Sequence, residues 1–377
     1  MASRTLVIGL LLVGCLAGVA LWRTAPVHGA TASPATWDRA AAAHYLDQRE
    51  LWWQQWPRAQ KDHGTVCISC HTNVPYAMVR PGLQRELAES IAPAAEKTML
   101  GSVEKRVTQW PEMETFYTDA KSGPGKTVES RATEAVLNAI ILAGQDSHLQ
   151  RLRPVTRTAF EEAWALQEST GALAGSWKWQ NFHLGPWEGE ESGYQGTALL
   201  LVEAVNAPGG YAKEPAVRPH LAAMAAYLRR EYAAQPLLNQ LYVLWASRRQ
   251  PGLLTAEDRE KLLAALQAAQ LPDGGWATSA LDQRERKDHS PAPTAGDGYA
   301  TGVIVLALEE TGTRKHDPIS NDDMLRRGLA WLAGNQQPDG TWTAASINKQ
   351  RDPHSDAALF MTDAATAYAV LALQTAR

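Results

Sequence analysis

Two short segments decide the fold: QLPDGGW at residues 270–276 and QPDGTW at residues 337–342. In both, an Asp-Gly pair supplies a turn, and the Trp that follows can fill the gap between neighbouring helical hairpins. A looser form of the pattern runs from Gly171 to Trp177. The recurrence indicates that the chain is built from internal repeats.

Each turn leads into a segment that is small and apolar on nearly every face. The three clearest are GYQGTALLL at 193–201, GYATGVIVL at 298–306 and AYAVLAL at 367–373. A helix that is apolar all round must be buried on all sides, as the inner helices of a barrel are. No run beyond residue 35 alternates with the two-residue period of a half-buried strand, so the chain is predicted to be all-α.

A more amphipathic helix precedes each turn, so an outer helix, a loop and an inner helix make one hairpin. Counting in this way gives six helical hairpins, which close naturally into an (α/α)6 toroid. Residues 35–377 are therefore predicted to form a single toroid domain. The expected bounds of the hairpins are about 38–90, 95–144, 156–206, 217–250, 257–311 and 321–376.

The Gln-x-x-Asp-Gly-x-Trp turns resemble the QW repeats of the squalene-hopene cyclase and protein prenyltransferase superfamily. The resemblance covers about two thirds of the chain, is strongest over residues 257–377, and implies an α/α toroid with QW-like turns. The catalytic groups of these enzymes do not carry over. The Asp-x-Asp-Asp acid motif of the cyclases keeps one carboxylate here, Asp363, and the zinc site of the prenyltransferases lacks its Cys, because no Cys follows Cys70.

Carboxylates are the weaker candidates for catalysis. Asp297 and Asp363 each stand near the start of an expected inner helix, where an Asp more simply caps exposed N–H groups. A carbohydrate-cleaving (α/α)6 barrel would need two facing carboxylates. Nothing in the sequence pairs the loop carboxylates, so solvated loop charge is the simpler interpretation of Glu188, Glu190, Glu191, Asp282, Asp288, Asp352 and Asp356.

The segment CISCH at residues 67–71 carries the most specific chemical pattern. Cys-x-x-Cys-His is the attachment pattern for c-type haem, in which two thiols bind the vinyl groups and the adjacent imidazole coordinates iron. The segment predicts a haem c held by Cys67, Cys70 and His71, with His71 as the metal ligand. Three other interpretations stay open: a Cys67–Cys70 disulfide or redox pair, half of a zinc site, and an incidental His.

By hairpin counting, this segment fills the loop of the first hairpin, and the next inner helix starts near Asn73. His71 is therefore expected at the rim of the toroid, near the mouth of its central cavity. Nearby Trp residues are expected to pack in the core, with a haem shield or an aromatic wall around an apolar or sugar ligand as the alternative. They are Trp52, Trp53 and Trp56 before the motif and Trp177, Trp179 and Trp187 in the third loop.

The N-terminal sequence indicates the compartment of the protein, and its net charge limits the classes of partner that are expected. Residues 1–29 are typical of an export signal, with an apolar run over residues 6–22 that could instead remain as a membrane tether. A lipoprotein cleavage box ending at Cys15 is a third interpretation, and all three place the bulk of the chain outside the cytoplasm, in the expected case in the periplasm. A net charge of −4, with 36 Lys+Arg against 40 Asp+Glu, argues against a nucleic-acid partner.

Together these features predict an exported toroid protein with a covalently bound haem c, which performs electron transfer or redox chemistry near a central cavity and meets a redox partner. One alternative is a haem-free toroid with a Cys67–Cys70 disulfide and a lipid or glycan in its cavity. Another is a cyclase-like or carbohydrate-active enzyme with Asp297 or Asp363 as its acid.

Overall fold

The computed structural model describes residues 37–311 and 321–376, all within one compact unit that spans residues 34–377. The expected export signal and membrane tether lie outside the described residues. Helices dominate, and the described residues hold no named strand, only the isolated bridges Gln60–Val66 and Leu184–Glu188. The prediction of an all-α protein is confirmed.

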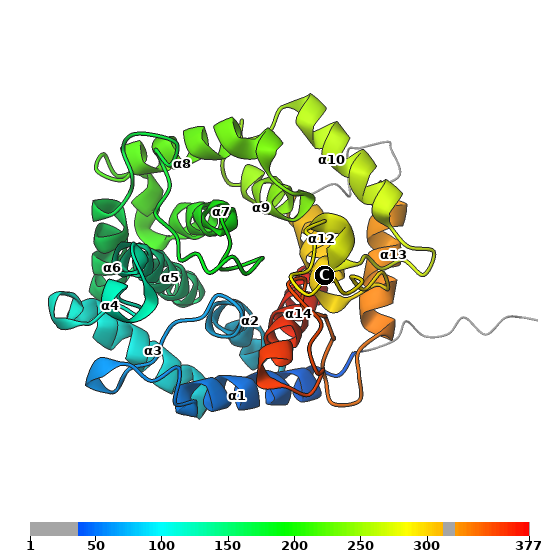
Figure 1. Cartoon of the computed structure of the whole chain (residues 1–377), viewed down its shortest axis with the longest axis horizontal. Helices are drawn as coiled ribbons and strands as arrows, with labels where there is room; N and C mark the ends of the chain where they lie inside the picture. Colours follow the sequence, from blue (N-terminus) through cyan, green and yellow to red (C-terminus); the bar gives the residue numbers. More distant parts are fainter. Residues whose placement is uncertain (1–36, 312–320, 377) are drawn as a thin grey trace, which may run out of the picture. The chain divides into compact units, whose positions relative to one another are not determined.

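Within residues 37–311 and 321–376, twelve long helices alternate between an outer and an inner ring (Figure 1). The outer helices are α1 (Arg39–Gln55), α3 (Ala94–Thr108), α6 (Pro154–Ala165), α8 (Arg218–Glu231), α10 (Ala256–Ala269) and α13 (Asn321–Gly334). The inner helices are α2 (Asn73–Glu86), α5 (Lys126–Leu149), α7 (Ser192–Asn206), α9 (Leu237–Ser247), α12 (Gly298–Glu310) and α14 (Asp356–Thr375). The loops add the short helices α4 (Asp119–Ser122) and α11 (Thr278–Leu281) and the 3-10 turns η1 (Asp62–Gly64), η2 (Trp110–Glu112), η3 (Pro208–Lys213) and η4 (Tyr232–Ala234).

The inner helices contact one another in chain order, and α14 packs against α2, so the last hairpin closes the ring onto the first. From α6 onward each outer helix packs mainly against the inner helix of the preceding hairpin, which ties neighbouring hairpins together. The six observed hairpins match the six expected ones. The (α/α)6 toroid is therefore confirmed. Its inner helices are buried on nearly every face, as their all-round apolar sequences require.

The Trp of each repeated turn is buried and hydrogen-bonded back to its own outer helix. The indole N–H groups of Trp177, Trp276 and Trp342 donate to carbonyl oxygens of α6, α10 and α13 at 2.7 to 2.8 Å. Each ring is at most 1% exposed. Trp serves here because the ring fills a large gap while its N–H satisfies a carbonyl near the end of the helix.

The Gln and Gly of the turns join each hairpin to the next. Gln270 donates to the carbonyl oxygens of Gly274, in its own turn, and of Met324, in the next outer helix. Gly340 has φ +88°, and a Cβ there would lie 2.3 Å from the carbonyl carbon of Ala41 in α1. A glycine is therefore required where the last turn meets the first hairpin.

Tyrosines fill the centre of the ring. The hydroxyls of Tyr242 and Tyr299 lie 3.2 Å apart, and the rings of Tyr299 and Tyr368 meet edge to face at 5.6 Å between centroids. All three are fully buried. Side chains therefore fill the centre of the toroid at the level of these tyrosines. The open cavities lie among the loops.

One described helix, α14, is long and apolar enough to cross a membrane. Of its most apolar stretch, 67% is buried inside the structure. Its contacts with α12 and α2 account for that composition, because an inner helix is covered on every side.

Candidate functional site

Loops that join outer to inner helices enclose a cavity of about 200 Å³. It lies between the loops of the first three hairpins and the last hairpin, and the CISCH segment forms part of its wall. Six large aromatic residues contribute to its wall: Trp53, Trp56, Phe116, Tyr117, Trp187 and Phe360. We call this cavity the aromatic pocket; it is smaller than the roughly 300–1,000 Å³ of pockets that hold drug-sized ligands.

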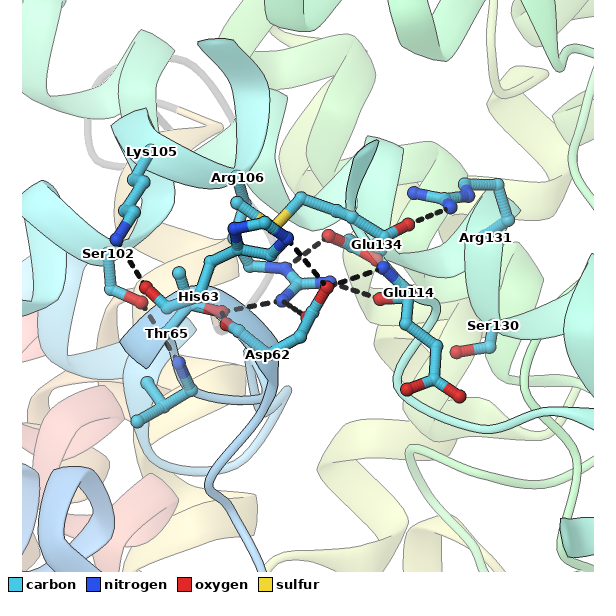
Figure 2. Close-up of polar contacts among 12 residues, drawn as sticks. Asp62, His63, Thr65, Ser102, Lys105, Arg106, Glu114, Ser130, Arg131 and Glu134 are labelled. Carbon is cyan, nitrogen blue, oxygen red and sulfur yellow. Dashed lines mark hydrogen bonds and ion pairs between the residues drawn. The ribbon is translucent and has the colours of Figure 1, made fainter. Parts of the chain in front are cut away.

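A buried arginine holds the loop that carries the CISCH segment. The guanidinium of Arg106 on α3 reaches Glu134 on α5 and the loop residues Asp62 and Thr65 (Figure 2). Nearby, the Oγ of Ser102 accepts a hydrogen bond from the N–H of Val66 at 3.1 Å. Arg106 and Glu134 are fully buried, so water does not compete for these contacts. They therefore fix the loop firmly to the helices of the toroid.

Cys67 and Cys70 line the aromatic pocket as free thiols, so the structure does not form the Cys67–Cys70 disulfide of the alternative hypothesis. Burial raises the pKa of Cys67 to about 12 and raises that of Cys70 as well. Both thiols are therefore protonated at neutral pH and are poor nucleophiles.

His71 is placed by packing and by one hydrogen bond. Its ring stacks on Phe360 at 4.0 Å between centroids and meets Trp53 edge to face at 5.1 Å. Its Nδ1 lies 2.9 Å from the hydroxyl of Thr72, which in turn donates to Asp363 at 2.8 Å. Since the hydroxyl proton goes to Asp363, the Nδ1–H of His71 donates to Thr72, and Nε2 keeps its lone pair.

Burial lowers the pKa of His71 to about 3, with the nearby positive charge of Arg49 acting in the same direction. The ring is therefore neutral at physiological pH. In this state Nε2 can accept a hydrogen bond from a ligand in the pocket.

The two Asp candidates have different roles. Asp297 is the N-cap of α12 and accepts from the N–H of Ala300 at 2.9 Å, as the capping interpretation predicts. Asp363 lies inside α14, whose N-cap is Ser355, so the interpretation of Asp363 as a cap is wrong. Its carboxylate instead pairs with Arg49 and orients Thr72, and neither Asp297 nor Asp363 lines the aromatic pocket.

Glu188 is the carboxylate that does line the aromatic pocket. Its backbone pairs with Leu184 in both directions, which places the side chain beside Trp187 in the pocket wall. Burial raises the pKa of Glu188 to about 7, with Lys126 opposing the shift. Glu188 is half-buried and lines the pocket, so it is not simply a charge on the outer surface of the loop.

The other loop carboxylates stay outside the aromatic pocket. Glu190 is 74% exposed beside His183, and Asp282 and Glu191 pair with Arg284. Asp288, Asp352 and Asp356 likewise contribute nothing to its wall.

Two further polar side chains of the pocket escaped the sequence analysis. Gln180 is 4% exposed, and neither its amide oxygen nor its amide nitrogen has a hydrogen-bond partner among the described residues. Arg351, from the loop of the last hairpin, also lines the pocket. No local sequence signal marks either one, because the groups around them come from distant hairpins.

Comparisons with known proteins identify the fold. No family model matches the chain, and no curated protein matches it. Unsaturated glucuronyl hydrolase from Bacillus sp. GL1 has a similar structure, with TM-score 0.53 and 13% identity, over 89% of this chain and 95% of that one. The GH76A alpha-1,6-mannanase from Salegentibacter sp. HEL1_6 follows with TM-score 0.51 and 10% identity, over 90% and 98%. A glycosidase variant in complex with glucose has TM-score 0.50 and 12% identity, over 89% and 97%.

These comparisons support the toroid class, but the similar structures are named as carbohydrate-active enzymes and none of those quoted is a squalene cyclase. They contradict the prediction of haem c and, with it, of iron and a cytochrome-like site. Among the described residues no group of three or more His, Cys, Asp or Glu is placed to hold a metal ion. The pocket that Cys67 and Cys70 line is small, at about 200 Å³.

Proposed function

We propose that this protein is a carbohydrate-active enzyme that binds one sugar residue in the aromatic pocket and uses Glu188 as its general acid. The observation that carries the proposal is the combination of the unpartnered Gln180 amide and the half-buried Glu188 carboxyl in the wall of one pocket. A sugar presents apolar C–H faces that pack on aromatic rings and hydroxyls that both donate and accept hydrogen bonds. A lipid would fill the pocket but leave Gln180 unsatisfied.

The raised pKa of Glu188, about 7, suits proton transfer at neutral pH, because both protonation states are then populated. In the proposed step the proton passes to the glycosidic oxygen, and the C1–O bond breaks with its electron pair moving to that oxygen. The water that adds to C1 then returns a proton to the Glu188 carboxylate. This step departs from the expected pair of facing carboxylates, because Glu188 is the one carboxylate among the described residues that line the pocket, so the same group gives the proton and later takes it back.

The neutral His71 completes the site as a hydrogen-bond acceptor. Thr72 and Asp363 act as positioning residues, since they fix the tautomer that leaves Nε2 free. A cyclase-like reaction with Asp363 as acid is disfavoured, because its carboxylate is paired with Arg49 at 2.8 Å.

The test measures binding and turnover on a panel of oligosaccharides. Glu188→Gln is expected to keep sugar binding and to lose about 10²-fold or more in turnover, the usual contribution of a general acid. Glu190→Gln, two residues away and exposed, is the matched control and should behave as the wild type. Gln180→Leu should instead weaken binding.

Full turnover by Glu188→Gln would overturn the proposed mechanism, and the absence of any sugar binding would overturn the function. The intact mass of the exported protein should equal that of its polypeptide. A mass higher by one haem, with the visible absorption of thioether-linked haem, would show that a different ligand occupies this region.

A further inference from the structure

A second, larger cavity adjoins the aromatic pocket. It has a volume of about 890 Å³ and lies between the loops of the fifth and sixth hairpins, over residues 278–297 and 339–362. Ser346 and Arg351 line both cavities, so a chain of linked sugars could run from one to the other. We call this space the loop cavity.

Arg286 lines the loop cavity and is only 5% exposed. Its Nη groups donate to the carbonyl oxygens of Pro291 and Ser346 and to the hydroxyl of Ser290. Its Nε has no hydrogen-bond partner in the described part of the chain. All of these partners are neutral, so the buried positive charge has no counter-ion among the residues that the structure describes.

This situation sets Arg286 apart from the other buried arginines. Each of those forms an ion pair with at least one carboxylate: Arg49 with Asp363, Arg80 with Asp47 and Glu89, and Arg106 with Glu134 and Asp62. A buried charge is strongly destabilising unless it is paired. Three of the four buried arginines in the described residues therefore have a carboxylate partner, and Arg286 at the loop cavity does not.

The other charges on the cavity wall do not supply the missing partner. Asp297 accepts from Ala300 and Thr278, and Asp339 accepts from the N–H and hydroxyl of Thr341, so both carboxylates are engaged in their own turns. Arg351 makes no hydrogen bond or ion pair with any residue that the structure describes. The cavity therefore presents two arginines with unused donors.

We propose that the loop cavity binds the anionic group, a carboxylate or a sulfate, of an acidic sugar whose neighbouring residue occupies the aromatic pocket. The guanidinium fork matches the oxygen pairs of both groups, and a bound anion would supply the counter-charge that Arg286 lacks. This inference rests on the proposed function and adds a substrate class to it, namely an acidic glycan.

The test compares three ligands of equal length by calorimetry: trigalacturonic acid, its carboxyl-reduced neutral counterpart, and a sulfated form of that neutral trisaccharide. Wild-type protein should bind at least one anionic ligand about tenfold or more tightly than the neutral one, and this preference should shrink with added salt. The anionic ligand that is preferred identifies the group as carboxylate or sulfate. In Arg351→Gln the ratio of anionic to neutral affinity should fall towards one.

Lys349→Gln is the matched control, because it removes an equal charge from an exposed position two residues away. It should keep the preference for the anionic ligand. Equal wild-type affinity for all three ligands, or an unchanged preference in Arg351→Gln, would overturn the anion site while leaving the sugar-binding proposal in place. Failure of all three ligands to bind, together with no turnover on the oligosaccharide panel, would overturn both.

Discussion

Replacing Glu188 by Gln should remove a pH-dependent loss of stability. A carboxyl whose pKa is raised by burial from 4.5 to about 7 holds its proton more tightly in the folded state than in the unfolded state. Folding is therefore favoured below the unfolded value, and stability falls as the pH rises through the interval from about 4.5 to 7. One pKa unit corresponds to about 1.4 kcal/mol, so the full loss is about 3 kcal/mol.

The assay is urea unfolding of wild-type protein and Glu188→Gln at several pH values between 4 and 8. Other buried carboxyls with raised pKa values, such as Glu50 and Glu203, titrate in both proteins and cancel in the difference. Gln carries no titratable proton, so the stability of the variant relative to wild type should rise by about 3 kcal/mol across this range.

Glu190→Gln serves as the control, because this carboxylate is 74% exposed, and its difference from wild type should stay flat with pH. A flat difference for Glu188→Gln would refute the reasoning. It would mean that the Glu188 carboxyl is solvated or paired in solution and is no better placed as an acid than its neighbours in the loop.

Three further predictions concern the fold. Trp342→Phe keeps most of the ring but leaves a carbonyl of α13 unpaired, so thermal or urea unfolding should show a loss of about 1–3 kcal/mol. Gly340→Ala should destabilise by more than about 1 kcal/mol, because of its positive φ and the contact with α1, whereas Gly334→Ala, with nothing within 4 Å, should be tolerated. Arg106→Met should lose about 3–5 kcal/mol by leaving Glu134 buried and unpaired, and Arg106→Met combined with Glu134→Leu should recover most of it. A double variant no more stable than Arg106→Met would contradict that explanation.

The toroid could be predicted because its signals are local. A turn such as QLPDGGW fixes its own geometry, and its Trp and Gln bond within the turn or to an adjacent helix. The all-round apolar inner helices can be buried in few other ways. The hairpin bounds follow directly from these turns.

The site could not be predicted in the same way, because its environment is assembled from distant segments. Glu188 and Glu190 have similar neighbours in the sequence, yet Glu188 lines an aromatic pocket and Glu190 faces solvent. The sequence alone favours a capping role for Asp363, because its partner Arg49 is 314 residues away. The local CISCH pattern likewise favoured haem, while the size of the pocket depends on Phe360 and Trp187 from other hairpins.

Hydrolysis in water enriched in oxygen-18 tests the central claim most directly. The protein is incubated with the oligosaccharide that it binds best, and the products are weighed by mass spectrometry. The account predicts two shorter sugars, one of which carries a single heavy oxygen at its new reducing end, and no such products from Glu188→Gln. Intact oligosaccharide after incubation, or cleavage without incorporation of heavy oxygen, would contradict it.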